Sequence, residues 1–153
     1  WLYNMTLKTM IDKAISKQPL IKPSRTKKPI KHTEANYQQQ VIEWSKWAYK
    51  CNPIAYPNLD LLHCSLNGVK LSALQATKSK QQGMLSGVPD LFLPVPIGGY
   101  HGLFIEMKSD KGRLSTNQTW FLSKVELLGY KIAVCYSADE AIKTIENYYL
   151  VPN

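Results

Sequence analysis

Two carboxylates and a lysine lie at the edge of, or within, two apolar runs of the chain. Asp90 opens the first run, and Glu106 lies in the second run, which ends at Lys108. Side chains two residues apart in a strand point to the same face, so Glu106 and Lys108 should share one face. Burying such charges is costly unless they are paired or bind a ligand. Together, the three groups suit a divalent metal ion, a water molecule and a phosphate.

This combination of groups is typical of phosphodiester hydrolysis, which needs an activated water, a neutralised phosphate and a stabilised leaving oxygen. A Mg²⁺ ion can help with all three, and one or two carboxylates such as Asp90 and Glu106 suffice to hold it. Lys108 cannot ligate a metal while charged, but its ammonium could orient the attacking water or stabilise charge on the phosphate. Whether it acts as a base depends on its pKa, which the sequence leaves open. The alternative is a structural salt-bridge cluster in a half-exposed sheet.

A helix from about Glu34 to Tyr49 is expected to approach these residues from one side. Its apolar residues recur at helical spacing and form an inner stripe of Tyr37, Val41, Trp44 and Ala48. Glu34 lies at the edge of this stripe and can face the site, whereas Glu43 on the opposite side should face solvent.

The remaining patterns predict a small α/β domain. Strands are expected at residues 61–66, 90–93, 102–108 and 131–136, and helices at residues 72–82, 115–128 and 137–149. The pair Asn67-Gly68 should form a tight turn after the first strand. The last two strands, with the helix between them, form a βαβ unit and should be parallel. The predicted fold is a small mixed β-sheet flanked by helices on both faces.

Capping patterns define the starts of the last two helices. Ser115 with Gln118, and Ser137 with Glu140, each match a capping box. Gly129 should end the first of these helices. The residues of that helix expected to face inward are Phe121, Leu122, Val125 and Leu128.

Positive charge is concentrated at the N-terminus. The chain of 153 residues carries a net charge of +8, and residues 1–32 hold eight Lys or Arg and one acid. This segment combines an amphipathic helical pattern over residues 6–17 with a proline-rich linker over residues 18–31. We therefore predict a basic arm, 1–32, and one domain, 33–153. The arm either contacts nucleic acid phosphates or is a solvated tail.

Composition excludes several other classes of protein. No apolar run approaches the roughly 20 residues of a membrane-spanning helix. Cys51, Cys64 and Cys135 form no CxxC motif, so we expect reduced, buried thiols and a cytoplasmic protein. The three histidines are far apart in the chain and show no zinc-ligand spacing.

The pair Pro89-Asp90 and the tripeptide Glu106-Met107-Lys108 resemble the two halves of the PD-(D/E)XK nuclease motif. The surroundings, over residues 33–150, resemble the VRR-NUC branch of that superfamily. The matching residues are Gly83, Gly87 to Leu91, Gly102 to Lys108, Ser115 and Gln118, with Glu34, Gln38, His63, Asn67, Gly68 and Lys80 upstream. The resemblance implies a restriction-endonuclease-like core and an endonuclease that depends on Mg²⁺ or Mn²⁺.

The resemblance also implies roles for individual residues. Asp90, Glu106, Lys108, Glu34 and Gln118 would be catalytic. The metal would be held by Asp90, Glu106, the backbone carbonyl of Met107 and Glu34, the last directly or through water. The helix-terminal positions of Glu34 and Gln118 have structural explanations as well, through the helix dipole and the capping box.

Contacts to DNA are expected from residues on either side of the site. Lys80 matches the family pattern, and Lys78 lies beside it. Lys111 and Arg113 follow Lys108 in a loop and could contact a phosphate that flanks the scissile bond, although a solvated loop explains them equally well. Ser115 is a further candidate, more readily explained as a helix cap.

The chain looks like a family member that stands alone as one small domain. Such members are similar to structure-specific nucleases encoded by bacteria or phages. This implies cleavage of branched DNA such as four-way junctions. Two paired cuts in a junction require two sites, so we expect a homodimer, with interface material in the N-terminal helix and in the aromatic residues Trp1, Tyr3, Trp47 and Tyr49. The alternatives are a duplex- or mismatch-directed endonuclease and a non-catalytic DNA-binding protein. The intact residues Asp90, Glu106 and Lys108 argue against the last.

Overall fold

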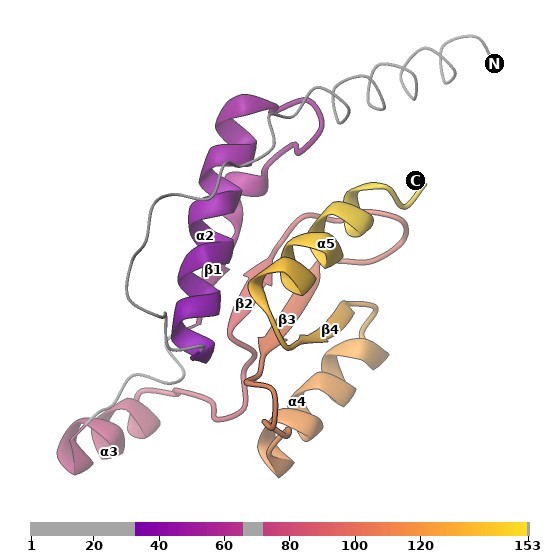
Figure 1. The fold of residues 1–153 in the computed structure, drawn as a ribbon. Coiled ribbons are helices and arrows are strands. Elements are labelled where there is room, and N and C mark those ends of the chain that lie inside the picture. The colour runs from indigo at the N-terminus through magenta and orange to yellow at the C-terminus, as the bar shows by residue number, and fades with distance from the viewer. Residues whose placement is uncertain (1–32, 66–71, 153) are drawn as a thin grey trace, which may run out of the picture.

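The computed structural model describes residues 33–65 and 72–152, which form a four-stranded sheet with helices around it (Figure 1). The strands occur in the sheet in the order β1 (His63–Cys64), β2 (Leu91–Leu93), β3 (Leu103–Met107) and β4 (Lys131–Cys135). The β1–β2 and β2–β3 pairs are antiparallel, and β3 and β4 are parallel. The predicted mixed α/β fold is therefore confirmed.

Helices pack on both faces of this sheet. The helices are α2 (Glu34–Cys51), α3 (Ala73–Gln81), α4 (Thr116–Leu127) and α5 (Ala138–Tyr149), with a short 3-10 helix η1 (Leu59–Leu61) after α2. Helix α4 connects β3 to β4 and completes the predicted βαβ unit. Helix α3 projects away from the sheet (Figure 1).

The strands alternate between two different environments. Leu103, Ile105 and Met107 of β3 are buried in the main core with Val41 of α2 and Ile145 of α5. On the opposite face, an aromatic cluster forms around Phe104, which stacks on Phe92 at 4.2 Å and meets Phe121 of α4 edge-on at 5.7 Å. This alternation is the period of two that the sequence predicts for a strand covered on both faces.

The helix boundaries follow the predicted caps. Ser115 and Gln118 form the expected capping box at the start of α4, and Gly129, at φ +83°, follows its end. The second predicted box is half correct. Ser137 accepts a hydrogen bond from the Glu140 amide, but Glu140 Oε2 accepts from the Tyr136 amide at 2.7 Å instead of the Ser137 amide.

The first predicted strand, 61–66, was too long. Residues 59–61 form a 3-10 helix, so the strand begins later than predicted, and β1 covers only His63–Cys64; residue 66 lies outside the described residues. The turn at Asn67-Gly68 and the basic arm, 1–32, lie outside the described residues.

Three predictions of burial were also wrong. Leu128 is 65% exposed because it is the C-cap of α4, past the last inward-facing turn. Cys51 and Cys64 are exposed, the first at the end of α2 and the second on the edge strand, whereas Cys135 is buried as expected. In α2, Trp44 is half-buried and packs against the core, as the inner stripe predicts, and Ser45 beside it is buried.

Candidate active site

The site is built on the polar face of β3. Glu106 and Lys108 point to the same side, and Lys108 Nζ donates to Glu106 Oε1 at 2.6 Å. Both residues are as buried as the core, with Glu106 1% and Lys108 6% exposed. The sequence predicted this shared face, and the structure brings the two side chains into direct contact.

Helix α4 adds a second donor to Glu106. Gln118 Oε1 accepts from the Ser115 amide at 2.9 Å, as the capping box requires, while Gln118 Nε2 donates to Glu106 Oε1. Gln118 therefore caps the helix and also holds a site carboxylate. Among the described residues, the other oxygen, Glu106 Oε2, is buried and has no hydrogen-bond partner.

Asp90 lies beside Glu106. It comes one residue before Leu91, which pairs with Ile105 of β3. Its Oδ2 accepts from the Met107 amide at 2.8 Å, and Gln38 of α2 also hydrogen-bonds the carboxylate. The Asp90 carboxylate is thus fixed to the neighbouring strand. Gln38 lies one helical turn after Glu34, a spacing that could have revealed its role.

Glu34 reaches the same end of the sheet from the first turn of α2. Its Oε1 accepts from the Ser109 amide at 3.0 Å, immediately after Lys108. The helix-face prediction thus holds for both acids, since Glu43 is exposed and bonded only locally, accepting from Gln39 Nε2 at 2.8 Å.

Burial dominates the electrostatics of the site. It raises the pKa of Glu106 to about 7, although the hydrogen bond from Lys108 acts in the opposite direction. Burial also raises the pKa of Asp90, against the lowering effect of the Met107 amide. For Lys108, burial alone would lower the pKa, but the hydrogen bond and charge of Glu106, with the charges of Glu34 and Asp90, raise it above its ordinary value. Lys108 is therefore held as a cation rather than as a ready base.

Comparison with known proteins agrees with this geometry. The family model of the VRR-NUC domain matches residues 28–139. The chain belongs to the VRR-NUC family. A solved structure described as a VRR_NUC domain protein is 28% identical, with a TM-score of 0.65, and the alignment covers 79% of this chain and 91% of that one. A search of curated proteins found no match. Membership of the family suggests a nuclease that acts on DNA.

In this VRR-NUC domain, a glycine holds α4 close to the segment that leads through Asp90 into β2. Gly87 has φ +90°, and a Cβ on it would lie 2.4 Å from the Asn117 carbonyl oxygen. Asn117 Nδ2 also donates to Ser86 Oγ at 3.1 Å. The positive φ and the close approach both require glycine. The sequence marked Gly87 as a motif residue, but only the fold shows that it packs against the turn that carries Gln118.

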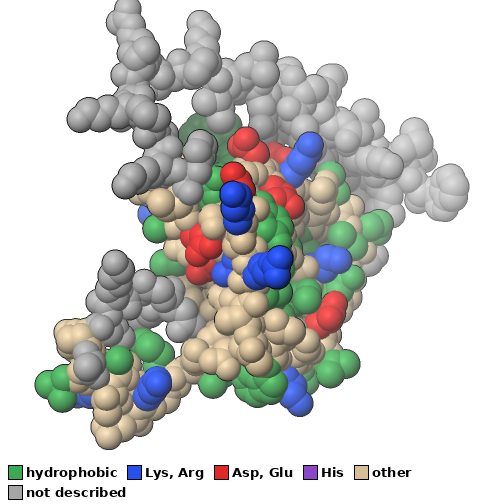
Figure 2. Space-filling view, turned by 60° about the horizontal axis from the view of Figure 1, so that its bottom comes forward, with side chains coloured by type: hydrophobic (Ala, Val, Ile, Leu, Met, Phe, Trp, Pro, Cys, Tyr) green, Lys and Arg blue, Asp and Glu red, His purple; other side chains and the backbone are tan. Residues whose placement is uncertain are grey.

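The residues predicted to contact DNA lie on α3, in the loop after β3 and at the start of α4. Figure 2 shows acidic and basic side chains side by side on one face of the molecule. Lys78 and Lys80 are exposed on α3, and Lys111 and Arg113 are exposed in the loop after β3. Ser115 Oγ accepts from the Gln118 amide at 3.3 Å, as a helix cap does. Binding roles for these five residues stay predictions.

Metal binding also stays a prediction. Within residues 33–65 and 72–152, no three His, Cys, Asp or Glu side chains group so that they could hold a metal ion. The candidate ligands in the VRR-NUC site are thus the pair Asp90 and Glu106, with the Met107 carbonyl at the end of β3. Glu34 is engaged by the Ser109 amide. In the same described ranges, no helix is long and apolar enough to cross a membrane.

Proposed function

We propose that this chain is a metal-dependent endonuclease that hydrolyses DNA phosphodiesters, with Asp90, Glu106 and Lys108 as its catalytic core. The observation that carries the proposal is the environment of Glu106. This carboxylate is as buried as the core, Lys108 and Gln118 hold one of its oxygens, and its other oxygen has no partner among the described residues. Burying an unpartnered carboxylate oxygen is costly, so a ligand at this position would explain it.

The available donors fit a hard divalent cation. Asp90 and Glu106 would supply carboxylate oxygens, Met107 a backbone carbonyl, and Glu34 a contact through water, which suits Mg²⁺ or Mn²⁺ because these ions keep several waters. When bound, the metal would polarise the phosphate and activate the attacking water. Two carboxylates without histidine or cysteine make a zinc site a poor alternative.

The protein side chains have distinct tasks in this reaction. Lys108, held as a cation, would stabilise the negative charge that develops on the phosphate. Gln118 would orient Glu106, and the Met107 amide would hold Asp90 beside it. Phosphates flanking the scissile bond would contact Lys111, Arg113 and the lysines of α3.

The proposed substrate is branched DNA, in particular the four-way junction, and the proposed assembly is a homodimer. The described part of the chain offers one such site, and one site cuts one strand at a time. A two-fold symmetric dimer would supply two sites in the relation that a junction's own symmetry requires. The described cysteines are all free thiols, which supports the expected cytoplasmic, reducing compartment.

The test is a panel of labelled duplex, flap, splayed and four-way DNA, incubated with Mg²⁺, Mn²⁺ or a chelator. Faster cleavage of the junction than of duplex, abolished by the chelator, is expected. Glu43→Gln, an exposed acid on the far side of α2, should cut like the wild type. Cleavage of duplex at least as fast as the junction would favour the duplex-directed alternative, and no cleavage at all would contradict the nuclease. In light scattering, a mass near 17.4 kDa would reject the dimer.

A further inference from the structure

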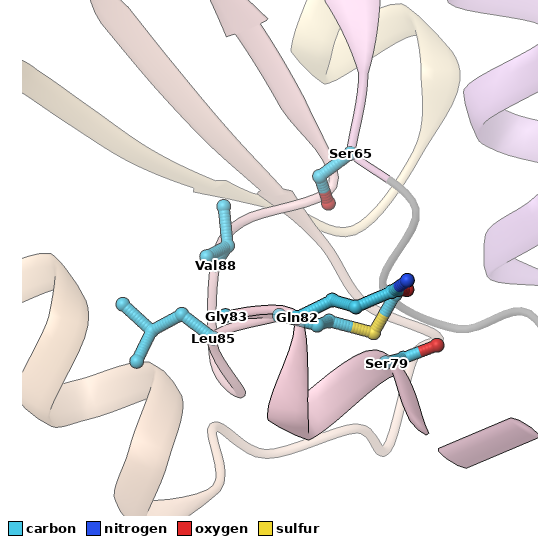
Figure 3. A pocket seen from close by; sticks show the side chains of 7 residues that line it. Ser65, Ser79, Gln82, Gly83, Leu85 and Val88 are labelled. Carbon is cyan, nitrogen blue, oxygen red and sulfur yellow. The ribbon is translucent and has the colours of Figure 1, made fainter. Parts of the chain in front are cut away.

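A second feature lies next to the candidate active site and is not explained by it. A pocket of about 520 Å³ lies between the end of β1 and the end of α3 (Figure 3). This volume is within the range of ordinary ligand sites. Its side chains come from Ser65, Ser79, Gln82, Met84, Leu85 and Val88.

The turn after α3 shapes this pocket. The Gly83 amide donates to the Lys80 carbonyl at 3.0 Å, and the Met84 amide donates to the Ser79 carbonyl at 2.9 Å. This pair of bonds is a Schellman motif, and Gly83 has the positive φ, +92°, that the motif needs. The turn directs the chain back past the helix end, so residues before and after Gly83 line the same pocket.

Main-chain contacts join the pocket to the candidate active site. The Ser65 amide donates to the Asp90 carbonyl at 2.9 Å, and Val88 precedes Asp90 by two residues. A strand of DNA with a phosphate at Asp90 would therefore have a neighbouring nucleotide within reach of the pocket.

The lining has neutral polar groups and apolar walls. Ser65 Oγ is buried and has no hydrogen-bond partner among the described residues, and Gln82 supplies both a donor and an acceptor. Met84, Leu85 and Val88 supply apolar surface. No charged side chain of the described ranges lines the pocket, which argues against a phosphate as its ligand.

A nucleobase matches this lining better. Its edge carries neutral donors and acceptors, and its faces are apolar enough to pack against methionine and leucine. Lys78 and Lys80 lie on either side of Ser79 in the chain and are exposed, where they could contact the backbone phosphates of the same nucleotide.

We propose that this pocket binds one unpaired base of the DNA strand that enters the active site. The inference rests on the proposed function and deepens it, because it names the feature of branched DNA that the protein reads. A base in an intact duplex would first have to be unstacked and unpaired, whereas a base in the single-stranded arm of a flap or splayed DNA is already unpaired. The pocket thereby favours branched DNA that carries an unpaired base over intact duplex, and it favours a four-way junction only where a base at the branch point is opened.

The test measures binding in the absence of metal, with the full chain and two DNA duplexes that differ at one position. One carries the fluorescent adenine analogue 2-aminopurine as an unpaired bulge, and the other carries it paired. The bulged DNA should bind about tenfold more tightly and change its fluorescence on binding. Ser65→Val and Gln82→Leu should each remove most of that preference without changing affinity for the paired DNA. Gln81→Leu, the neighbouring exposed glutamine outside the lining, is the matched control and should keep it.

Equal affinity for the two DNAs, or an equal effect of Gln82→Leu and Gln81→Leu, would overturn the inference. A parallel cleavage assay with Mg²⁺ separates the two proposals. If the protein cuts DNA but shows no preference for the unpaired base, the inference fails and the nuclease stands. If it binds the bulged base selectively but cuts no DNA, the nuclease fails and the pocket stands.

Discussion

At the end of β3 and just past it, the two faces of the chain are equally buried but chemically opposite. Ile105 and Met107 are 0% exposed on one face, and Glu106 and Lys108 are 1% and 6% exposed on the other. The first pair packs among apolar side chains between the sheet and helices α2 and α5. The second pair forms an ion pair beside α4. One short strand thus carries both a core and a candidate active site.

This difference separates what stabilises the fold from what serves chemistry. Apolar burial favours folding, whereas an ion pair removed from water often contributes nothing or is destabilising. The raised pKa of Glu106, about 7, shows that its surroundings disfavour the charged form. Residues 103–107 pair with a strand on each side. The backbone that carries the polar side chains is therefore rigid, and no loop has to be ordered to position them.

Substitutions on the polar face should reduce cleavage activity most. Lys108→Met keeps the length and packing of the side chain but removes the charge. We expect single-turnover cleavage to fall by about 10²–10³-fold, the effect of losing one stabilising group at a developing oxyanion. Lys124→Met, on the exposed side of α4, is the control. If both variants cut equally well, Lys108 has only a structural role.

Substitutions on the apolar face should reduce the stability of the fold most. Ile105→Ala creates a cavity in the main core and should lower the free energy of unfolding by about 2–5 kcal/mol in a denaturant titration. Cleavage per folded molecule should stay near the wild-type value. A loss of specific activity as large as that of Lys108→Met would show that the two faces are not separable.

The polar face should also make stability depend on pH. The folded pKa of Glu106, about 7, lies above its ordinary value of 4.5, so between these values the folded state binds more protons than the unfolded state. Without metal, this group's contribution is fully present below about pH 4.5 and is lost as pH rises through 7. We expect a decline of about 2 kcal/mol in urea titrations, at roughly 1.4 kcal/mol per unit of pKa shift with allowance for relaxation. Glu106→Gln should flatten that slope, and an unchanged slope would contradict the assignment.

The two helices with complete capping boxes offer a finer comparison. Gln75 and Gln118 cap α3 and α4 in the same way, but only Gln118 also donates to Glu106. Glutamate can complete the box as well as glutamine, so Gln→Glu should preserve both helices. At position 118 it would place a carboxylate against Glu106 and should slow cleavage about tenfold, worth roughly 1.4 kcal/mol. Gln75→Glu should cut normally, and equal rates for the two variants would limit Gln118 to capping.

Local signals predicted most of the elements. The caps at Ser115 and Ser137 and the turn at Gly129 mark helix ends through bonds between residues three or four apart. Alternation in residues 103–108 likewise predicted which side chains share a face. Predictions failed for features that depend on pairing between residues far apart in sequence. Strand β1 pairs with β2, some 27 residues away, and exposure of Cys64 depends on its place at the sheet edge.

The contacts of the candidate site likewise fall into those that the local sequence predicts and those that it does not. The contact between Glu106 and Lys108 follows from the period of one strand. The Ser109 amide donates to Glu34, 75 residues away in sequence, and the Met107 amide donates to Asp90, 17 residues away. The family resemblance indicated Glu34 and Asp90 as site residues. Which atoms they meet depends on how α2 and β2 cross β3, which no local pattern encodes.

The most direct test of the central claim, that Glu106 is buried for chemistry, is the single-turnover cleavage rate of Glu106→Gln on saturating DNA with Mg²⁺. Gln keeps the size of the side chain and can still accept from Lys108, and circular dichroism would establish the folded fraction. The rate per folded molecule should fall by at least about 10³-fold, equivalent to roughly 4 kcal/mol of transition-state stabilisation. A rate within about threefold of the wild type, a difference below roughly 0.7 kcal/mol, would contradict the account.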